Sequence, residues 1–346
     1  MSELVKIDGG AGGGQILRTA LALSTLTGIP CRISNIRENR PTPGLRPQHQ
    51  QAVSLLANIA QTRVEPLEST TSVIEFRPQG FEITDGNVDI GTAGSVSLLL
   101  QSVLPLAYRS QQPVRITVTG GTDVKWSPPI DYFKNVFLPS VNNFGIDANL
   151  SIEKTGFYPK GGGKATLTIN TSSTKKCIYD KRDSLNYISI YSKASADLLH
   201  NDVATRQAKH AVTVLETLGH TIGDVEQQHV NTASTGSIIV LAATYRQTVA
   251  GFSCIGEPGK PAESVATDAI SDFQQFHDSA GVVDRHLADQ LIPYLAIAGG
   301  AIKVADVTDH IQTNVDVVNE FGFPCNFETA PDNAVRIIAP GQSYEH

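Results

Sequence analysis

The stretch Gln15-Ile16-Leu17-Arg18-Thr19-Ala20-Leu21-Ala22-Leu23-Ser24-Thr25-Leu26-Thr27 decides the fold, because its apolar residues recur at helical spacing and Gly28 follows as a stop. A strand pattern from Cys31 to Ile36 comes directly after this helix. A second helix pattern covers Gln48 to Ala60, and strand character returns from Ser72 to Phe76. The first part of the chain therefore predicts alternating helices and strands.

The same succession returns twice farther along the chain. The second copy is predicted as helix, strand, helix and strand over Ser95 to Tyr108, Val114 to Thr119, Tyr132 to Phe144 and Lys164 to Ile169. The third copy is predicted in the same order over Asp284 to Ala298, Ala301 to Val304, Gln312 to Phe321 and Val335 to Ile338. We expect an α/β (α+β) fold with a large domain of three repeated helix/strand units and mixed sheets.

A segment of different character lies between the second and third copies. Its predicted elements are a strand, a long amphipathic helix, two strands and a helix: Tyr187 to Tyr191, Asp197 to Leu218, Ser237 to Thr244, Phe252 to Ile255 and Ala262 to Phe276. Polar stretches flank it on both sides. We therefore predict a large domain over residues 1–182 and 280–346, with a smaller α/β domain inserted over residues 183–279.

Composition limits the kind of protein. No run of about 20 apolar residues is present, and the start lacks the basic and apolar regions of a signal peptide. The four scattered cysteines lack zinc spacing and disulfide density: Cys31, Cys177, Cys254 and Cys325. We expect no membrane association and a reducing cytoplasm.

The net charge of −7 argues against a broad basic surface for nucleic acid. A polyanion would have to meet a local cluster of cations. Four arginines fall within a short stretch, namely Arg32, Arg37, Arg40 and Arg46. Taken alone, this cluster is better explained as a solvated loop.

Two segments have the character of phosphate sites. The glycine-rich stretch 9–14 before the first helix can present backbone N–H groups and the positive helix end to an anion, or can simply form a tight turn. Arg18 lies one turn into that helix. The loop from Arg37 to His49 presents Arg37 and Arg40 three residues apart, and the arginine fork suits a phosphate monoester.

Two further segments complete the candidate chemistry. Gly120-Gly121-Thr122-Asp123 is followed by Ser127-Pro128-Pro129-Ile130-Asp131-Tyr132, where a Pro-Pro step and a ring suit either a flat base or a turn with a core tyrosine. His310 stands at a strand-to-helix junction in Thr308-Asp309-His310-Ile311-Gln312-Thr313-Asn314. A neutral imidazole is a competent nucleophile when a neighbour fixes its tautomer.

Together these segments resemble the RNA 3′-terminal phosphate cyclase family. The matching motifs run in the family's order across nearly the whole chain: Gly12-Gly13-Gly14-Gln15-Ile16-Leu17-Arg18, Arg37 to His49, Gly91-Thr92-Ala93-Gly94-Ser95, Gly120-Gly121-Thr122-Asp123, Gly156-Phe157-Tyr158-Pro159-Lys160-Gly161-Gly162-Gly163, Leu287-Ala288-Asp289-Gln290, and His310 with Thr313-Asn314. The resemblance implies the three-unit large domain, related to the enolpyruvyl-transferase architecture, with a smaller insert domain.

The resemblance also implies an ATP-dependent enzyme of the ligase class. His310 would attack the α-phosphorus of ATP, with Mg²⁺ or Mn²⁺ as the divalent metal, and form a histidine–AMP intermediate. The AMP would pass to an RNA 3′-phosphate, and the 2′-hydroxyl would then close a 2′,3′-cyclic phosphate and release AMP.

Site residues follow from the resemblance position by position. The implied nucleotide pocket consists of Gln15, Pro128, Tyr132, His286, Asp289 and Gln290. The implied phosphate and RNA site consists of Arg18, Arg37, Arg40, Gln48 and His49.

The chain departs from the family at two of these places. The family often has an aromatic ring where His286 stands, and it has a Glu before the triple glycine, where this chain has Ala11 in a shorter loop. Either Asp8 or water is the candidate for a metal contact in its place.

Two other readings remain open. One is a non-catalytic, cyclase-like scaffold for RNA binding or ribosome assembly, which the altered Ala11 favours and the presence of His310 opposes. The other is an enolpyruvyl-type transferase, which rests on architecture alone and gives His310 no role.

Overall fold

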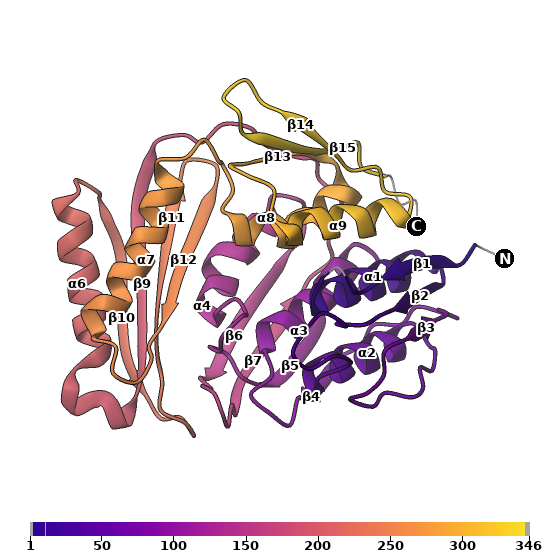
Figure 1. The fold of residues 1–346 in the computed structure, drawn as a ribbon, viewed down its shortest axis with the longest axis horizontal. Helices are drawn as coiled ribbons and strands as arrows, with labels where there is room; N and C mark the ends of the chain where they lie inside the picture. Colours follow the sequence, from indigo (N-terminus) through magenta and orange to yellow (C-terminus); the bar gives the residue numbers. More distant parts are fainter. Residues whose placement is uncertain (1–2, 11, 343–346) are drawn as a thin grey trace.

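Four sheets carry the fold in the computed structural model, which describes residues 3–10 and 12–342 (Figure 1). The first sheet has the order β1-β2-β3, with β1 (Val5–Asp8), β2 (Cys31–Ser34) and β3 (Ile74–Phe76). The second has the order β4-β5-β7-β6, with β4 (Gly86–Asp89), β5 (Val114–Gly120), β6 (Ala148–Lys154) and β7 (Gly163–Ile169). The third has the order β14-β15-β13-β8, with β8 (Cys177–Tyr179), β13 (Gly300–Val304), β14 (Asn326–Thr329) and β15 (Val335–Ala339).

These three sheets repeat one pattern. Each begins with a parallel pair, β1 with β2, β4 with β5 and β8 with β13, and the central strand then pairs antiparallel with a later one. The second and third sheets add an antiparallel edge strand, β6 or β14. A parallel pair needs a crossover, and helices supply it in each unit. The fold is therefore the mixed α/β arrangement of three repeated units that the periodicity predicts.

Helices connect the strands of each unit. The first unit has α1 (Gly14–Thr27) and α2 (Pro47–Ile59). The second has α3 (Val96–Val103) with η1 (Leu104–Tyr108), and then α4 (Ile130–Tyr132), η2 (Phe133–Phe137) and α5 (Leu138–Asn142). The third has α8 (Arg285–Ala298) and α9 (Asp309–Glu320).

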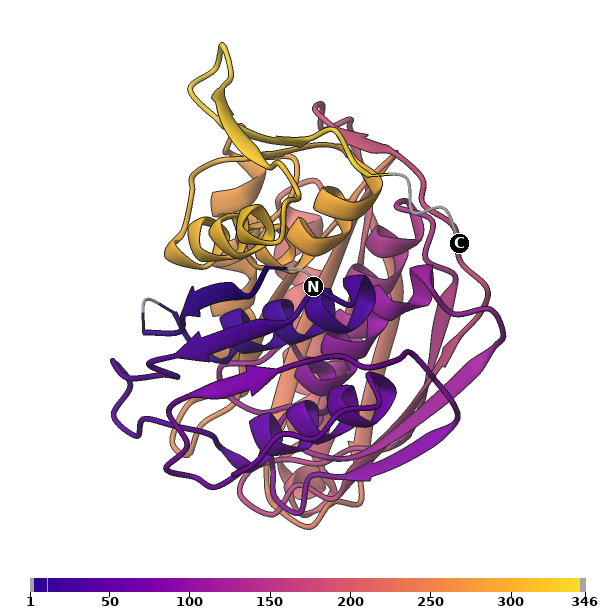
Figure 2. The same cartoon turned by 90° about the vertical axis from the view of Figure 1, so that its right-hand side faces the viewer.

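The fourth sheet is formed by the segment of the chain that follows β8 and precedes α8. It has the order β10-β9-β11-β12, with β9 (Leu185–Ser195), β10 (Ile222–Val230), β11 (Ser237–Tyr245) and β12 (Val249–Ile255). Its helical segments are η3 (Ala196–Asn201), α6 (Val203–Thr217) and α7 (Ala262–His277). Figure 1 shows this sheet at the left, with α6 and α7 covering its outer face, and Figure 2 shows its strands behind the helices of the repeated units.

Strand β11 is buried on both faces, which explains its continuous apolar sequence. Ile239, Leu241 and Ala243 pack with α6 and α7, whereas Ile238, Val240 and Ala242 pack into the main core. Alternate residues of a strand point to opposite faces, so one strand joins two cores. The fourth sheet therefore lies directly against the helices of the second unit.

Helix α1 lies in the middle of the molecule. It contacts α2, α3 and η1, and from the third unit α9. Ala20, Leu21 and Leu23 are completely buried, so the helix is covered on nearly every side. Gly28 ends it in the left-handed conformation, as expected, with φ of 74°. Because α1 contacts α9, the glycine loop at its start comes next to the third unit.

Two predicted helices differ from the structure. The helix expected from Asp197 to Leu218 breaks at Asp202, which has φ of 50° and separates η3 from α6. The helix expected from Tyr132 to Phe144 contains the π-helical turn η2, which ends directly before Leu138-Pro139. Proline has no N–H for the α-helical ladder and clashes with the carbonyl one turn earlier, which accounts for the wider turn.

A helix that crosses a bilayer must be long and continuously apolar. Within residues 3–10 and 12–342 no helix meets both conditions.

Candidate active site

The start of α1 brings two glycines against arginine and histidine side chains. Gly13 caps the helix without a side chain, and the first turn carries no acidic residue. A Cβ built on Gly13 would lie 3.0 Å from a guanidinium nitrogen of Arg40. A Cβ on Gly14 would lie 2.1 Å from Nε2 of His49 and 3.1 Å from a nitrogen of Arg18. The helix end and these side chains therefore form one cationic anion seat, defined by Gly13, Gly14, Arg18, Arg40 and His49.

His49 enters this anion seat as a neutral hydrogen-bond donor. Its Nδ1 accepts from the backbone N–H of Arg46 at 3.1 Å, which leaves the proton on Nε2, the nitrogen nearest Gly14. Burial, together with the charges of Arg18, Arg37 and Arg46, lowers the pKa of His49 to about 3. At neutral pH the ring is thus uncharged and presents an N–H to the seat.

The arginines have different positions. Burial lowers the pKa of Arg18 to about 10, against the opposing charge of Asp289, so the guanidinium stays charged near neutrality. Arg40 is exposed and has no carboxylate within ion-pair distance in the described part of the chain. Arg37 instead donates to the carbonyls of Thr42 and Gly44 at 2.9 and 2.8 Å. Burial lowers its pKa, as do the charges of Arg46 and Arg40. Arg37 therefore holds the loop that presents Arg40.

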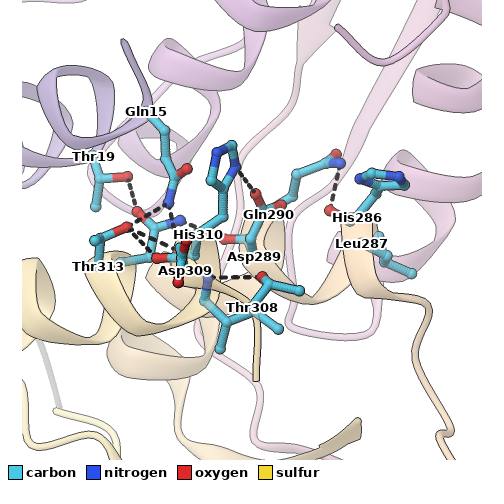
Figure 3. A network of polar contacts seen from close by, with 12 residues as sticks. Gln15, Thr19, His286, Leu287, Asp289, Gln290, Thr308, Asp309, His310 and Thr313 are labelled. Carbon is cyan, nitrogen blue, oxygen red and sulfur yellow. Dashed lines mark hydrogen bonds and ion pairs between the residues drawn. The ribbon is translucent and has the colours of Figure 1, made fainter. Parts of the chain in front are cut away.

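His310 is the second residue of α9, and its ring meets Asp289 of α8 (Figure 3). The Nδ1 atom of His310 lies 3.2 Å from Oδ2 of Asp289. The His310 side chain is 51% exposed and that of Asp289 is 15% exposed, so the ring is accessible while its partner is held. If Nδ1 donates to the carboxylate, the lone pair of Nε2 is free to attack an electrophile.

Side chains of α1 fix this pair in place. Gln15 Nε2 donates to the carbonyl of His310 at 2.6 Å, and Thr19 Oγ1 donates to Oδ1 of Asn314 at 2.8 Å. Asn314 Nδ2 in turn donates to the carbonyl of Asp289 at 2.7 Å. One helix of the first unit thereby positions both partners from the third unit. Gln15 also has a buried Oε1 that lacks a hydrogen-bond partner within residues 3–10 and 12–342.

A polar group at the start of α8 lies beside this pair. Gln290 Nε2 donates to the carbonyl of His286 at 2.6 Å, and Gln101 Nε2 donates to Oε1 of Gln290 at 2.6 Å. The ring of His286 is exposed, and Figure 3 shows it on the far side of Asp289 from His310. Gln101 was not predicted from the sequence. It follows Leu100 in the apolar helix α3, where a long polar side chain is the signal that could have marked it.

Tyr132 lies underneath α8, with 3% of its surface exposed. Its hydroxyl donates to Asp284, which also accepts from the backbone N–H groups of His286 and Leu287 and so caps α8. Burial raises the pKa of the Asp284 carboxyl and that of the Tyr132 hydroxyl. Tyr132 thus supports the start of α8 through Asp284, and its buried ring has no exposed face on which a base could stack.

A chain of contacts connects the anion seat to Pro128. Gln48 Oε1 accepts from the backbone N–H of Ser95 at 2.8 Å. The hydroxyls of Ser95 and Ser97 lie 2.9 Å apart, and Ser97 donates to the carbonyl of Pro128 at 2.6 Å. Gln48 therefore fixes a loop of the second unit, and its amide nitrogen lies 3.5 Å from Nε2 of His49.

The described residues do not form a protein cage for a divalent metal. Among them no group of three or more His, Cys, Asp or Glu side chains has metal-binding geometry. Oδ1 of Asp8 accepts from the N–H of Gly10 and from Asn35, at 2.8 and 3.1 Å. Ala11 lies outside the described residues. A divalent ion could still reach such a site through phosphate oxygens of a substrate and water, as Mg²⁺ commonly does.

Comparisons with known proteins identify relatives along nearly the whole chain. The family model described as RNA 3′-terminal phosphate cyclase matches residues 9–329. The RNA 3′-terminal phosphate cyclase of Halobacterium salinarum is 38% identical over 345 residues, covering 96% of this chain and 99% of the relative. The proteins of the same name from Pyrococcus furiosus and Archaeoglobus fulgidus are each 41% identical, over 321 and 323 residues. Both cover 92% of this chain, and 93% and 95% of the relatives.

Proposed function

Because this chain belongs to the RNA 3′-terminal phosphate cyclase family, we propose that it converts an RNA 3′-phosphate into a 2′,3′-cyclic phosphate with ATP as co-substrate. The observation that carries the proposal is the exposed imidazole of His310, whose Nδ1 lies within hydrogen-bond distance of the Asp289 carboxylate. Helix α1, which begins at the anion seat, contacts His310 through Gln15. This combination provides a nucleophile and a place for the phosphates that it would attack.

The first step joins AMP to the protein. Nε2 of His310 attacks the α-phosphorus of ATP, a P–N bond forms, and the bond to pyrophosphate breaks. Asp289 accepts the Nδ1 hydrogen bond and stabilises the positive charge that develops on the ring. Arg18, Arg40 and the N–H of His49 stabilise the departing phosphates, because all three converge on Gly13 and Gly14.

The second and third steps move the AMP and close the ring. An oxygen of the RNA 3′-phosphate attacks the phosphorus of the histidine–AMP, the P–N bond breaks, and an RNA-to-AMP anhydride forms. The 2′-hydroxyl then attacks the RNA phosphorus, loses its proton and expels AMP. The ribose holds that hydroxyl next to the phosphorus, which contributes about 7 kcal/mol or more when the orientation is good.

The remaining site residues have positional roles in this proposal. We assign the nucleoside of ATP to Gln101, His286 and Gln290, because they form a hydrogen-bonded group next to Asp289 at the start of α8. Gln48 binds the Ser95 loop, beside which we place the RNA phosphate, and Arg37 holds the loop that carries Arg40. A divalent cation, Mg²⁺ or Mn²⁺, would arrive on the ATP phosphates and add positive charge there; the described carboxylates do not form its cage.

Two further expectations remain part of the proposal. We place the protein in a reducing compartment such as the cytoplasm, because all four cysteines are free thiols. We also propose that residues 183–279 are a domain inserted into the large domain of residues 1–182 and 280–346. The separate apolar cluster between the fourth sheet and helices α6 and α7 supports that division.

The function is tested with two labelled substrates, ATP and RNA. The protein is incubated with Mg²⁺ or Mn²⁺ and ATP labelled at the α-phosphate, and protein-bound label that is acid-labile and alkali-stable is measured. A short RNA with a labelled 3′-phosphate is then tested for ends that resist phosphatase. Cyclised ends without labelled protein would refute the covalent route, and neither product would support the non-catalytic scaffold instead.

We predict that Asp289→Asn slows formation of the labelled protein by about 100-fold, the order of loss expected when a reacting group is misplaced. The amide keeps the shape but removes the charge that holds and stabilises the His310 ring. Single-turnover labelling measures the rate. Asp309→Asn is the matched control, because Asp309 is an exposed carboxylate next to His310 and lies in the first turn of α9. Equal losses in the two variants would contradict a specific role for Asp289.

We predict that Gly14→Ala also reduces labelling by about 100-fold. The added methyl group would lie 2.1 Å from Nε2 of His49 and would force the ring out of the anion seat. Gly86→Ala is the control, since a Cβ at Gly86 meets no atom closer than 3.6 Å. Thermal unfolding shows whether both variants remain folded. Full activity of a folded Gly14→Ala variant would remove His49 from the mechanism.

A further inference from the structure

Trp126 exposes a large aromatic ring to solvent, and this ring does not contribute to the buried core. It is the one tryptophan in the sequence, and 96% of its surface is exposed. Its φ of 61° is in the left-handed region, which bulky side chains rarely adopt. Ser127 Oγ donates to the carbonyl of Val124 at 2.9 Å and closes the turn that holds this conformation. Such strain is maintained by surrounding structure and commonly marks a functional position.

A second exposed ring lies on the neighbouring loop. Tyr158 is 72% exposed. Its loop is joined to that of Trp126 because Asp123 bridges to Phe157 and the N–H of Thr122 donates to Gly156 at 2.9 Å. Buried Asp123 clamps the same loop by accepting from the N–H of Ile130 at 3.2 Å. The two aromatic residues are therefore carried by rigid, adjoining loops.

Both loops lie next to the proposed RNA phosphate site. The Trp126 loop reaches it through the contacts Pro128–Ser97–Ser95–Gln48. The Tyr158 loop reaches it through Gly161, since a Cβ there would lie 2.8 Å from Cα of Ala93, two residues before Ser95. The loops that carry the two exposed rings thus adjoin the loop that Gln48 fixes.

Exposed lysines lie close in sequence to both rings, although the protein as a whole is acidic. Lys125, Lys154 and Lys160 are exposed and lie within four residues of Trp126 or Tyr158. Lys125 is paired with Glu257 at 2.5 Å. Lys154 and Lys160 have no carboxylate within ion-pair distance among residues 3–10 and 12–342. Lysines without a carboxylate partner, close in sequence to exposed rings, suit a single-stranded nucleic acid, because phosphates and bases alternate along it.

We propose that Trp126 and Tyr158 form a stacking platform for unpaired bases of the RNA on the 5′ side of its reacting end, with Lys154 and Lys160 next to the intervening phosphates. The assignment rests on the proposed cyclase function. In the proposed reaction the anion seat receives the RNA terminal phosphate after pyrophosphate has left, so a protein of net charge −7 needs a further local site for the rest of the strand. Unstacked RNA bases commonly bind on tryptophan and tyrosine rings.

Trp126 itself reports the binding. Its fluorescence is followed while single-stranded RNA of about eight nucleotides with a 3′-phosphate is added without ATP. We expect quenching by this RNA, none by ATP or inorganic phosphate alone, and loss of the quenching as salt is raised. Quenching by ATP alone would assign the ring to the nucleotide and overturn the proposal. An unchanged signal at saturating RNA would overturn it too.

Kinetics separate the platform from the cyclase reaction. Trp126→Ala and Tyr158→Ala are expected to raise the KM for the longer RNA by roughly five-fold to more than a hundred-fold, the range found for removal of one stacking ring. A nucleoside 3′-phosphate should be affected far less, and labelling of the protein by ATP should be unchanged. Trp126→Phe should restore much of the affinity. Tyr187→Ala, which removes a 40% exposed ring from β9, is the control.

The possible failures are distinct. If the wild-type protein neither takes label nor cyclises RNA, the proposed function fails, while RNA-dependent quenching would still support the platform. If the wild-type protein is active but both alanine variants keep its KM for the longer RNA, the platform is wrong and the cyclase proposal stands.

Discussion

His310→Ala is expected to abolish the labelled protein completely, because it removes the atom to which AMP would be joined. No neighbouring side chain can replace it: the rings of His49 and His286 lie elsewhere, one in the anion seat and one beyond Asp289. The loss should therefore exceed that of every other single change proposed above. The rate with labelled ATP is compared with that of the wild-type protein, and RNA cyclisation is assayed in parallel.

The folded structure should tolerate this change. The His310 side chain is 51% exposed, and the hydrogen bond from Gln15 goes to its backbone carbonyl, which alanine retains. Urea unfolding is expected to change by less than about 0.5 kcal/mol, as for most surface substitutions. His200→Ala is the control, since His200 is an exposed histidine on η3. Labelling that persists in a folded His310→Ala variant would place the nucleophile on another residue.

The helices of the repeated units were predictable because their ends are marked in the sequence. Gly13 and Gly28 flank α1, and the observed helix starts only one residue before the predicted one. The strands that were predicted correctly in the interior of sheets, such as β5 and β11, have apolar side chains on one or both faces. Burial produced the periodicity from which these elements were predicted.

The strands that escaped prediction lie at sheet edges. The strands that were not predicted are β1, β4, β6, β8, β10 and β14, and each of them is at an edge of its sheet. Strand β10 has the sequence Ile-Gly-Asp-Val-Glu-Gln-Gln-His-Val and is mostly exposed. An edge strand needs only one partner and often carries polar or charged residues, which protect it from pairing with other chains. Its sequence therefore does not alternate clearly.

The site was predictable as a set of residues but not as a set of contacts. The resemblance placed Asp289 in the nucleotide pocket, and the structure shows its carboxylate next to His310. That contact depends on α8 packing against α9, and the bonds from Thr19 and Gln15 depend on α1 reaching the third unit. These partners are separated by up to 298 positions, which no local pattern connects. Gln101 was missed for the same reason.

The second large effect is predicted for an ion pair between the fourth sheet and the second unit. Lys193 of β9 lies 2.6 Å from Oδ2 of Asp131 in α4, and their side chains are only 9% and 7% exposed. Asp123 is buried beside them. Burial and the charge of Asp131 raise its pKa to about 6, against the opposing charge of Lys193. Lys193 is thus the cation that two buried carboxyl groups share.

Lys193→Met is expected to lower the free energy of unfolding by about 3–5 kcal/mol, because it leaves a buried carboxylate without its partner. Urea unfolding measures the change. Lys164→Met is the control: its pair with Glu153 is 45% and 38% exposed, so the change there should stay below about 1 kcal/mol. Asp131→Asn added to Lys193→Met should recover much of the loss.

The pH dependence distinguishes this electrostatic explanation from a simple packing defect. A carboxyl group whose pKa is raised in the folded protein favours folding when it is protonated, and it weakens folding as the pH rises through that pKa. Removing the cation should raise the pKa of Asp123 further. Lowering the pH from about 7 to about 5 should therefore stabilise the Lys193→Met variant relative to the wild-type protein. A deficit that is the same at both pH values would instead mean that methionine packs badly at this interface, and that charge is not the cause.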